Sequence, residues 1–557
     1  MGQLCQKCRR ALRELLCRLS ELCSNWAYKA RELLARICEC CCLWPGARTR
    51  NGSLYRPVLQ QHEKRAAREF LRHLEKDFEE SPLSNESLEA LRTLSFSELP
   101  DLQQSAALYY LHVSQHLNTP LPEDYLEPYH ALLQSSDLEV QRMSSLSLVN
   151  FLLEGNVKKE VVVEVGLLEP VLELLESDDA AVQCNSCACI MTLASSESNQ
   201  DTIGSAGAIV PLLSLAKSYD PRVQQNAVGA ILNLTYSERI QQILCQEGAL
   251  PVLTILLQSS DSEVQYYSCS ALSKIASNPE HHKAMLHVGD RFLLRMLLSL
   301  MSSSVDKVVC QSCLCLRNLA ESGDTKADLV EMKILPPLLL LLDSDNKEVQ
   351  QASITLLCSL SQHPSNQTAL MCEEVLESLE ALLQTQNTNK VIVSHTACII
   401  ENLSLSENIQ EIIESACLEG LLRALLSPDN DETCLQYVAS CVAELTKHEV
   451  TALHLLKRMD TALIRHLVRL AGGLQHMELS YQAACIIAHL ASHEAMRSKL
   501  RCQIPEILCY LSNFLSHQEP RFQELGVSTL RTLSQDAGFL SVIDQSQLLE
   551  KTNLIIE

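Results

Sequence analysis

Aromatic residues are scarce in this 557-residue chain, at 4% of the total, and only two residues are Trp. Gly (16 residues) and Pro (18 residues) are also few for this length. Apolar residues nevertheless make up 46% of the sequence, so Leu, Val, Ile, Ala and Cys must form most of the core. This composition argues against a disordered or β-rich chain and favours closely packed helices.

Long hydrophobic runs are also missing. The longest window without a charged residue, residues 350–372, contains Gln, Ser, Asn and a His363-Pro364 pair, so it does not predict a membrane-spanning helix. Arg and Glu residues between positions 9 and 14 interrupt the apolar residues of the N-terminus, which argues against a secretory signal. Without export, the 25 Cys residues are expected to be reduced thiols.

Motifs of catalysis are missing as well. We find no Gly-rich phosphate loop, no His-Glu-x-x-His pair and no nucleophile elbow, so we expect neither an enzyme nor a cofactor. The adjacent pair His281-His282 is expected in a surface turn rather than in a metal site. Two Cys triads resemble metal knuckles, and they are Cys184, Cys187, Cys189 and Cys310, Cys313, Cys315. Because both triads occupy the same positions of a repeated pattern, we interpret them as buried core residues and predict no metal site.

The repeated pattern is the main feature that the sequence does contain. Residues 223–235, VQQNAVGAILNLT, return in altered form along the chain at spacings of 38 to 45 residues. Such a period is the signature of stacked helical repeats. The first residues of the copies are Leu102, Val140, Val182, Val223, Val264, Val308, Val349, Ile392, Cys434, Leu479 and Phe522.

Each repeat predicts two substantial helices, often preceded by a short one. The middle helix follows a Gly that supports a tight turn, as at Gly166, Gly207 and Gly248, and it usually has Pro in its first turn. A polar turn with Asp or Ser comes next, and the third helix is expected to open at the Val-Gln pair. The sequence therefore predicts an all-α solenoid.

The order Gly-Ala-(Ile/Leu)-Pro-Leu-Leu, then Val-Gln…Ala…Leu-(Arg/Leu)-Asn-Leu, resembles the armadillo-repeat family. HEAT repeats are the alternative within the same fold class. The resemblance covers residues 83–549, about eleven repeats, and implies a right-handed superhelix whose third helices line a concave, protein-binding groove. We interpret residues 48–82 as a linker with an approach helix, and residues 550–557 as a C-terminal tail.

One position of the third helix predicts how such a groove would bind a peptide. Armadillo grooves commonly use Asn, ten residues after the first residue of the repeat, to hydrogen-bond the backbone of an extended peptide. Asn suits this role because it offers both a donor and an acceptor, although it could instead bond only a neighbouring repeat. Nuclear-import receptors place Trp four residues earlier, and the absence of Trp there argues against a transport receptor. The predicted peptide-groove residues are Asn150, Asn233, Asn318 and Asn402.

Residues 1–47 predict a basic, Cys-rich amphipathic helix that anchors the chain to a membrane. Gly2 is the only possible acceptor for N-myristoylation, although Gln6 replaces the usual Ser or Thr. Cys5 and Cys8 are candidate S-acylation sites that would supply a second lipid. Residues 1–50 carry ten Lys/Arg against four acidic residues, which favours an anionic membrane surface. A coiled-coil or docking helix is the alternative.

The rest of the chain carries a net charge of −29, which argues against nucleic acid and favours partners with basic segments. An acylated N-terminus followed by an uninterrupted array is similar to the lipid-anchored vacuolar members of the armadillo family. That resemblance implies an adaptor on the cytoplasmic face of the vacuolar or lysosomal membrane, which binds cytosolic or membrane proteins in its groove and no small-molecule substrate. A soluble, catenin-like adhesion or signalling scaffold with a coiled-coil head is the alternative.

Overall fold

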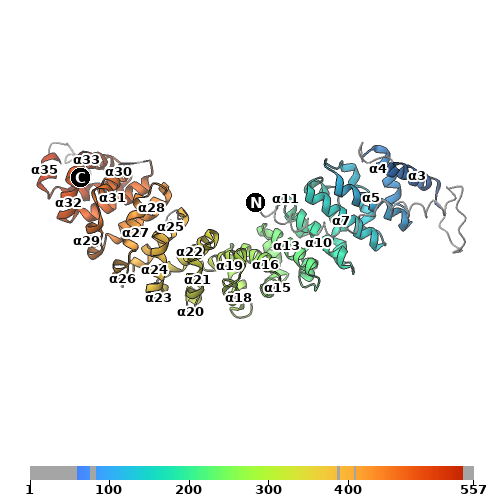
Figure 1. Cartoon of the computed structure of the whole chain (residues 1–557), viewed down its shortest axis with the longest axis horizontal. Helices are drawn as coiled ribbons and strands as arrows, with labels where there is room; N and C mark the ends of the chain where they lie inside the picture. The colour runs from blue at the N-terminus through green and yellow to red at the C-terminus, as the bar shows by residue number, and fades with distance from the viewer. Residues whose placement is uncertain (1–58, 76–82, 385–388, 407–408, 474, 544–557) are drawn as a thin grey trace. The chain divides into compact units, whose positions relative to one another are not determined.

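Every regular element of the described chain is a helix (Figure 1), which confirms the all-α prediction. The computed structural model describes residues 59–75, 83–384, 389–406, 409–473 and 475–543. The chain divides into two compact halves, Met1–Ile275 and Ala276–Glu557, called here the N-terminal and C-terminal halves. The predicted anchoring helix of residues 1–47, most of the linker and the C-terminal tail lie outside the described residues.

The third helices of successive repeats pack side by side within each half. In the N-terminal half they are α5 (Pro100–His116), α7 (Leu138–Glu154), α10 (Ala180–Leu193), α13 (Pro221–Leu234) and α16 (Ser262–Ile275). In the C-terminal half they are α19 (Asp306–Leu319), α22 (Lys347–Ser361), α25 (Lys390–Ser404), α28 (Glu432–Leu445), α31 (Met477–Ala491) and α34 (Pro520–Leu533).

The second helices form another row, and many of them pack against the third helix of their own repeat. They are α4 (Asn85–Ser95), α6 (Tyr129–Leu133), α9 (Leu168–Glu173), α12 (Ile209–Leu215), α15 (Ala249–Leu256), α18 (Phe292–Leu300), α21 (Leu335–Leu342), α24 (Glu373–Gln384), α27 (Cys417–Leu426), α30 (Thr461–Gly472) and α33 (Ile504–Leu515).

Short first helices complete the repeats. They are α8 (Lys159–Glu164), α11 (Glu197–Ser205), α14 (Glu238–Gln246), α17 (His282–Leu286), α20 (Gly323–Glu331), α23 (Pro364–Leu370), α26 (Ile409–Glu414), α29 (Glu449–Arg458), α32 (Glu494–Leu500) and α35 (Ala537–Ile543). Helix α3 (Gln61–Glu75) precedes the array and packs against α4, burying Phe70. Four 3-10 turns are η1 (Glu123–Leu126), η2 (Leu174–Glu176), η3 (Pro279–His281) and η4 (Arg501–Gln503). None of the described helices is both long and apolar enough to span a membrane.

The first residue of each repeat copy is a core residue. All eleven of these side chains are at most 4% exposed, from Leu102 at 0% to Leu479 at 4%. Burying a Val, Leu or Ile side chain stabilises a fold by about 1.5–3 kcal/mol. The position that marks the period in the sequence is therefore fixed by packing.

The third helix begins before the Val-Gln pair, so the predicted start was two residues too late. In the fourth copy, α13 begins at Pro221, two residues before Val223, because Asp220 caps it by accepting a hydrogen bond from the backbone N–H of Arg222. The Gln of the pair has a different role. Gln224 Nε2 donates to the carbonyl oxygen of Ala216 at 3.1 Å and thereby ties the third helix to the preceding turn.

The same tie recurs in other repeats. Gln183 Nε2 donates to Ser177 O at 2.6 Å, and Gln350 Nε2 donates to Leu342 O at 2.9 Å. The Val-Gln signature thus combines a buried apolar side chain with a carboxamide that satisfies a turn carbonyl.

The Gly before the second helix adopts the left-handed backbone that the turn requires. Gly166, Gly207 and Gly248 have φ values of +83°, +92° and +82°. Lys333 precedes α21 in the same way and has φ +61°. A side chain in this conformation costs about 1–2 kcal/mol relative to Gly, so this repeat contains local strain.

The Cys triads were predicted in the core, and five of the six residues lie there, with Cys187, Cys189 and Cys315 at 0% exposed. Cys310 departs from the prediction because it is half-buried. Burial raises the pKa of the three fully buried thiols, and it raises the pKa of Cys313 to about 12. The surface position expected for the His pair was wrong. His281 and His282 are 7% and 9% exposed, because their segment packs as η3 and α17, where His282 Nε2 donates to the carbonyl oxygen of Ala276.

Candidate protein-binding surface

The third helices of each half pack side by side and form what we call the third-helix face of that half. The predicted groove residues lie on these helices, Asn150 and Asn233 in the N-terminal half and Asn318 and Asn402 in the C-terminal half. Asn150, at the C-terminal end of α7, is buried, with only 3% of its surface exposed. Its Nδ2 donates to Ser114 Oγ on α5 at 3.0 Å, and its Oδ1 is buried with no hydrogen-bond partner among the described residues. Asn150 therefore bonds the preceding third helix.

Asn233 and Asn402 make the same kind of contact but are half-buried rather than buried. Asn233 Nδ2 donates to the carbonyl oxygen of Met191 on α10 at 2.7 Å, and Asn402 Nδ2 donates to Ser361 Oγ on α22 at 2.9 Å. No donor from the described residues reaches the Oδ1 of either side chain. Asn233 and Asn402 therefore each retain the Oδ1 acceptor, while Nδ2 donates to the preceding third helix. Asn318 on α19 is also half-buried.

Other residue types also contact the end of the preceding third helix from this position, which lies ten residues after the first residue of the repeat and is called here the tenth position. Ser359 Oγ donates to Ala320 O at 3.5 Å, and His489 Nδ1 lies 2.9 Å from Thr446 Oγ1. These contacts match the alternative that the sequence left open for this position, a hydrogen bond between neighbouring repeats. We call this set of contacts the C-terminal clasp.

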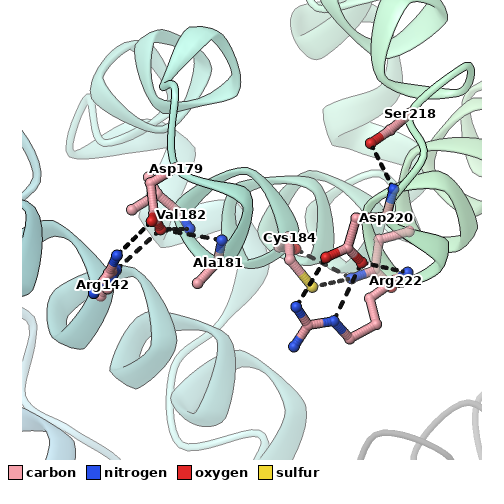
Figure 2. A network of polar contacts seen from close by, with 9 residues as sticks. Arg142, Asp179, Ala181, Val182, Cys184, Ser218, Asp220 and Arg222 are labelled. Carbon is pink, nitrogen blue, oxygen red and sulfur yellow. Dashed lines mark hydrogen bonds and ion pairs between the residues drawn. The ribbon is translucent and has the colours of Figure 1, made fainter.

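A second set of contacts joins the N-terminal ends of the third helices, and Figure 2 shows it around α10. Arg142 on α7 donates from Nε to Asp179 Oδ1 at 3.0 Å and also from Nη2 to Oδ2. Asp179 in turn accepts from the backbone N–H groups of Ala181 and Val182 and so caps α10. The hydrogen bond from Arg142 lowers the pKa of Asp179 to about 2. We call these contacts the N-terminal clasp.

The next boundary uses different residues. Asp220 pairs with Arg222 within its own repeat at 2.9 Å (Figure 2). Asn226 Nδ2 on α13 donates to Cys184 O on α10 at 3.1 Å. Asn185 makes the equivalent contact one repeat earlier, donating to Arg142 O at 3.2 Å. This position, three residues after the first residue of the repeat, was not predicted from the sequence, although the recurring VQCN and VQQN patterns would have indicated it.

In the repeat that contains α13, Gly229 stands at the position where import receptors carry Trp. Gly229 is buried, and a Cβ atom there would lie 2.5 Å from Met191 Sδ and 3.5 Å from Tyr267 Cε2. The neighbouring third helices thus occupy the space that a Trp ring would need. Near the end of α13, Tyr236 is 46% exposed, and the Lys274 ammonium lies 4.4 Å from the centre of its ring. This contact is a cation–π pair on the same face.

Acidic residues are distributed unevenly among the helices of the N-terminal half. The five third helices carry four acidic and three basic residues, whereas the other α-helices from α4 to α15 carry nine acidic and three basic residues. The charged residues of the third helices are Asp101, Glu139, Glu154, Glu263, Arg142, Arg222 and Lys274. Within the α-helices from α4 to α16, most of the acidic residues therefore belong to helices other than the third helices.

Comparison with known proteins agrees with this helix arrangement. The family model for the Armadillo/beta-catenin-like repeat matches residues 156–195, 196–236 and 237–277. The chain carries armadillo repeats. A solved structure of an engineered protein aligns with 74% of the chain and 99% of its own length at a TM-score of 0.65 and 23% identity. A structure from work on a phosphorylation switch between cadherin and beta-catenin aligns with 84% of the chain and 98% of its own length at a TM-score of 0.65 and 14% identity.

These two similarities show the fold, and they confirm the armadillo-type solenoid. Among curated proteins, Vacuolar protein 8 from Gibberella zeae is 42% identical over 117 residues, or 21% of each chain. Vacuolar protein 8 from Yarrowia lipolytica is 41% identical over 112 residues, or 20% of this chain and 19% of the relative. The matched segments span about a fifth of the length of these relatives.

Proposed function

We propose that the chain is a membrane-anchored adaptor that binds partner proteins on its third-helix face. Armadillo repeats are typically protein-binding scaffolds without catalytic activity. The similarity to fungal Vacuolar protein 8 carries the proposed location, the cytoplasmic face of the vacuolar or lysosomal membrane. In this proposal, Gly2, Cys5 and Cys8 supply the lipid anchor, and the armadillo repeats supply the binding face.

The proposed binding face includes the half-buried Asn side chains at the tenth position of their repeats, and two of these, Asn233 and Asn402, have an available acceptor. Asn233 and Asn402 already donate to the preceding helix, so each offers Oδ1 to a backbone N–H of an extended segment. Asn318 occupies the same position of its repeat. Asn150 differs because it is 3% exposed, and we assign it to the contact between helices rather than to a bound segment.

In this proposal, electrostatic attraction would act mainly on the approach of a partner rather than on the bound complex. The acidic excess on the first and second helices attracts a partner with basic segments, which raises the rate of association. The third helices of the N-terminal half are nearly balanced, so backbone hydrogen bonds rather than ion pairs would hold the segment in place.

Two matched substitutions test the binding face. Unstructured peptides are first selected from a library on the full-length wild-type chain, and their dissociation constants are measured by fluorescence anisotropy. Asn233→Ala should weaken binding by about two- to tenfold, since one backbone hydrogen bond contributes about 0.5–1.5 kcal/mol. Asn150→Ala is the control, because it removes a similar contact between helices without removing an exposed acceptor. Equal effects of both substitutions would show that only helix packing matters and that the face does not bind through Asn233.

A localisation experiment tests the anchor separately. Full-length fluorescent fusions of the wild type, of Gly2→Ala and of Cys5→Ser/Cys8→Ser are imaged together with a vacuolar or lysosomal membrane marker. We expect the wild type on that membrane and both variants dispersed. Variants that remain on the membrane would refute the lipid anchor, and a wild type that never reaches the membrane would refute the proposed location.

A further inference from the structure

Exposed cations gather at one turn of the C-terminal half. Residues 457–469, KRMDTALIRHLVR, contain four basic residues and one acidic residue, although the chain beyond residue 50 carries a net charge of −29. The four basic side chains are exposed. We call them the basic corner, and they are Lys457, Arg458, Arg465 and Arg469.

The turn from α29 to α30 positions the basic corner. Its first two members end α29. Asp460 then caps α30 by accepting a hydrogen bond from Leu463 N at 2.8 Å. Arg465 and Arg469 are four residues apart, so they lie on the same exposed face of α30, about 6 Å apart along its axis.

The next repeat fixes the end of α29. Lys499 Nζ donates to Leu456 O at 3.0 Å and to Met459 O at 2.8 Å. These carbonyl groups at the end of the helix are thereby satisfied without Lys457 or Arg458, and both of those side chains remain exposed.

The basic corner lacks acidic partners. Among the residues that the structure describes, no carboxylate forms an ion pair with any of its four members. Arg469 Nη2 instead lies 2.8 Å from His466 Nδ1, and burial lowers the pKa of that imidazole, so it accepts the hydrogen bond in its neutral form. Arg501 in the next repeat differs, because it pairs with Asp536 at 2.6 Å.

Apolar side chains adjoin the corner on α29. Val450, Leu453 and Lys457 follow one another at three- and four-residue steps, so they share one face of the helix. Val450 is 53% exposed and Leu453 is 41% exposed. Exposed apolar residues beside cations are typical of a surface that lies against lipid headgroups. Cations held by no fixed partner also suit a fluid anionic surface, which demands no fixed geometry.

We propose that the basic corner is a membrane contact of the C-terminal half, which binds the headgroups of anionic lipids while Val450 and Leu453 lie at the headgroup boundary. Each Lys or Arg near such a surface strengthens binding by about fivefold. The choice of a lipid surface rests on the proposed membrane location. The contact itself needs no acylation of Gly2, so it is tested on protein that carries no lipid.

Vesicle co-sedimentation of the full-length, unacylated chain tests the inference. The vesicles are phosphatidylcholine with or without phosphatidylserine. We expect Arg465→Gln/Arg469→Gln to weaken binding to the anionic vesicles by at least about tenfold. Lys217→Gln/Arg239→Gln is the matched control, because it removes the same charge from two exposed residues of the N-terminal half. It should leave binding unchanged, and equal losses in both variants would overturn the inference.

The basic N-terminus binds the same vesicles in our proposal, so its share is measured separately. Arg9→Gln/Arg10→Gln/Arg13→Gln is compared alone and in combination with Arg465→Gln/Arg469→Gln. The loss caused by the α30 substitutions should appear in both backgrounds. If it appears in neither, the corner does not bind lipid. The result is independent of where the acylated protein is found in cells.

A conservative variant separates a lipid surface from an acidic protein. Arg465→Lys/Arg469→Lys keeps both charges and loses the planar guanidinium fork, so it should retain vesicle binding. A loss as large as that of the Gln variant would contradict a lipid contact. A corner that captures soluble polyglutamate but not vesicles would also overturn it, in favour of an acidic protein. Circular dichroism checks folding, and Lys457→Gln/Arg458→Gln repeats the test on α29 if the α30 variant unfolds.

Discussion

Replacing Asp179 by Ala should destabilise the N-terminal end of α10 by about 2 kcal/mol. The side chain accepts hydrogen bonds from Ala181 N and Val182 N, and loss of an N-cap costs about 1 kcal/mol. The same carboxylate pairs with Arg142 of the preceding repeat, and this side chain is 38% exposed. Solvent therefore screens the pair, which adds at most about 1 kcal/mol.

The two contributions separate in a double-mutant cycle. Asp179→Asn keeps a capping oxygen and loses the charge, and Arg142→Met keeps the side-chain stem and loses the ion pair, so each should cost less than about 1 kcal/mol. Their coupling should equal the cost of the ion pair. Asp220→Ala is the matched control. It removes the cap of α13, whose Arg222 partner lies in the same repeat, so no coupling with a neighbouring repeat is lost.

The assay must be local, because an array of repeats contacts only its neighbours and need not unfold as one unit. Hydrogen exchange of peptides that cover α10 measures the opening free energy there, and urea unfolding followed by circular dichroism reports the global effect. If Asp179→Asn lowers the opening free energy as much as Asp179→Ala does, capping of α10 contributes no more to stability than the ion pair with Arg142. If Arg142→Met shows no coupling to Asp179, the N-terminal clasp does not connect neighbouring repeats.

Two further substitutions probe the backbone and the pH dependence. Lys333→Gly should raise the free energy of unfolding by about 1 kcal/mol, because Lys333 holds φ +61°, a backbone conformation that Gly adopts without steric strain. A lower urea midpoint would contradict this. Burial, assisted by the charge of His116, lowers the pKa of His112 to about 4, so between about pH 6.5 and 4 the unfolded chain binds a proton that the folded chain does not. Stability should therefore fall as the pH drops through this range, and His112→Gln should weaken that dependence in urea titrations at pH 7 and pH 5.

The sequence predicted the core more completely than the binding face. The apolar position that opens each repeat copy recurs at spacings of 38 to 45 residues and is buried in all eleven copies. Because a buried position requires an apolar residue, periodic burial can be recognised from the residue types alone. The left-handed turns were predictable at Gly166, Gly207 and Gly248 but not at Lys333, where the stacked neighbours impose the same backbone on a residue that disfavours it.

The polar positions were only partly predictable. Asn at the tenth position was expected, with binding a peptide and bonding a neighbouring repeat both left open. In the structure, Asn150, Asn233 and Asn402 donate to the preceding third helix. A carboxamide satisfies either role with the same atoms, so residue type alone does not separate them.

By itself, the sequence determined the repeat, its length and its buried frame, because each depends on the spacing of apolar residues along one chain. Only the tertiary structure decided which polar groups meet. Asn233 reaches Met191 across 42 residues of sequence, and Arg142 reaches Asp179 across 37. Stacking brings such pairs within 3 Å, and their identity depends on how neighbouring helices are placed rather than on the spacing within either helix.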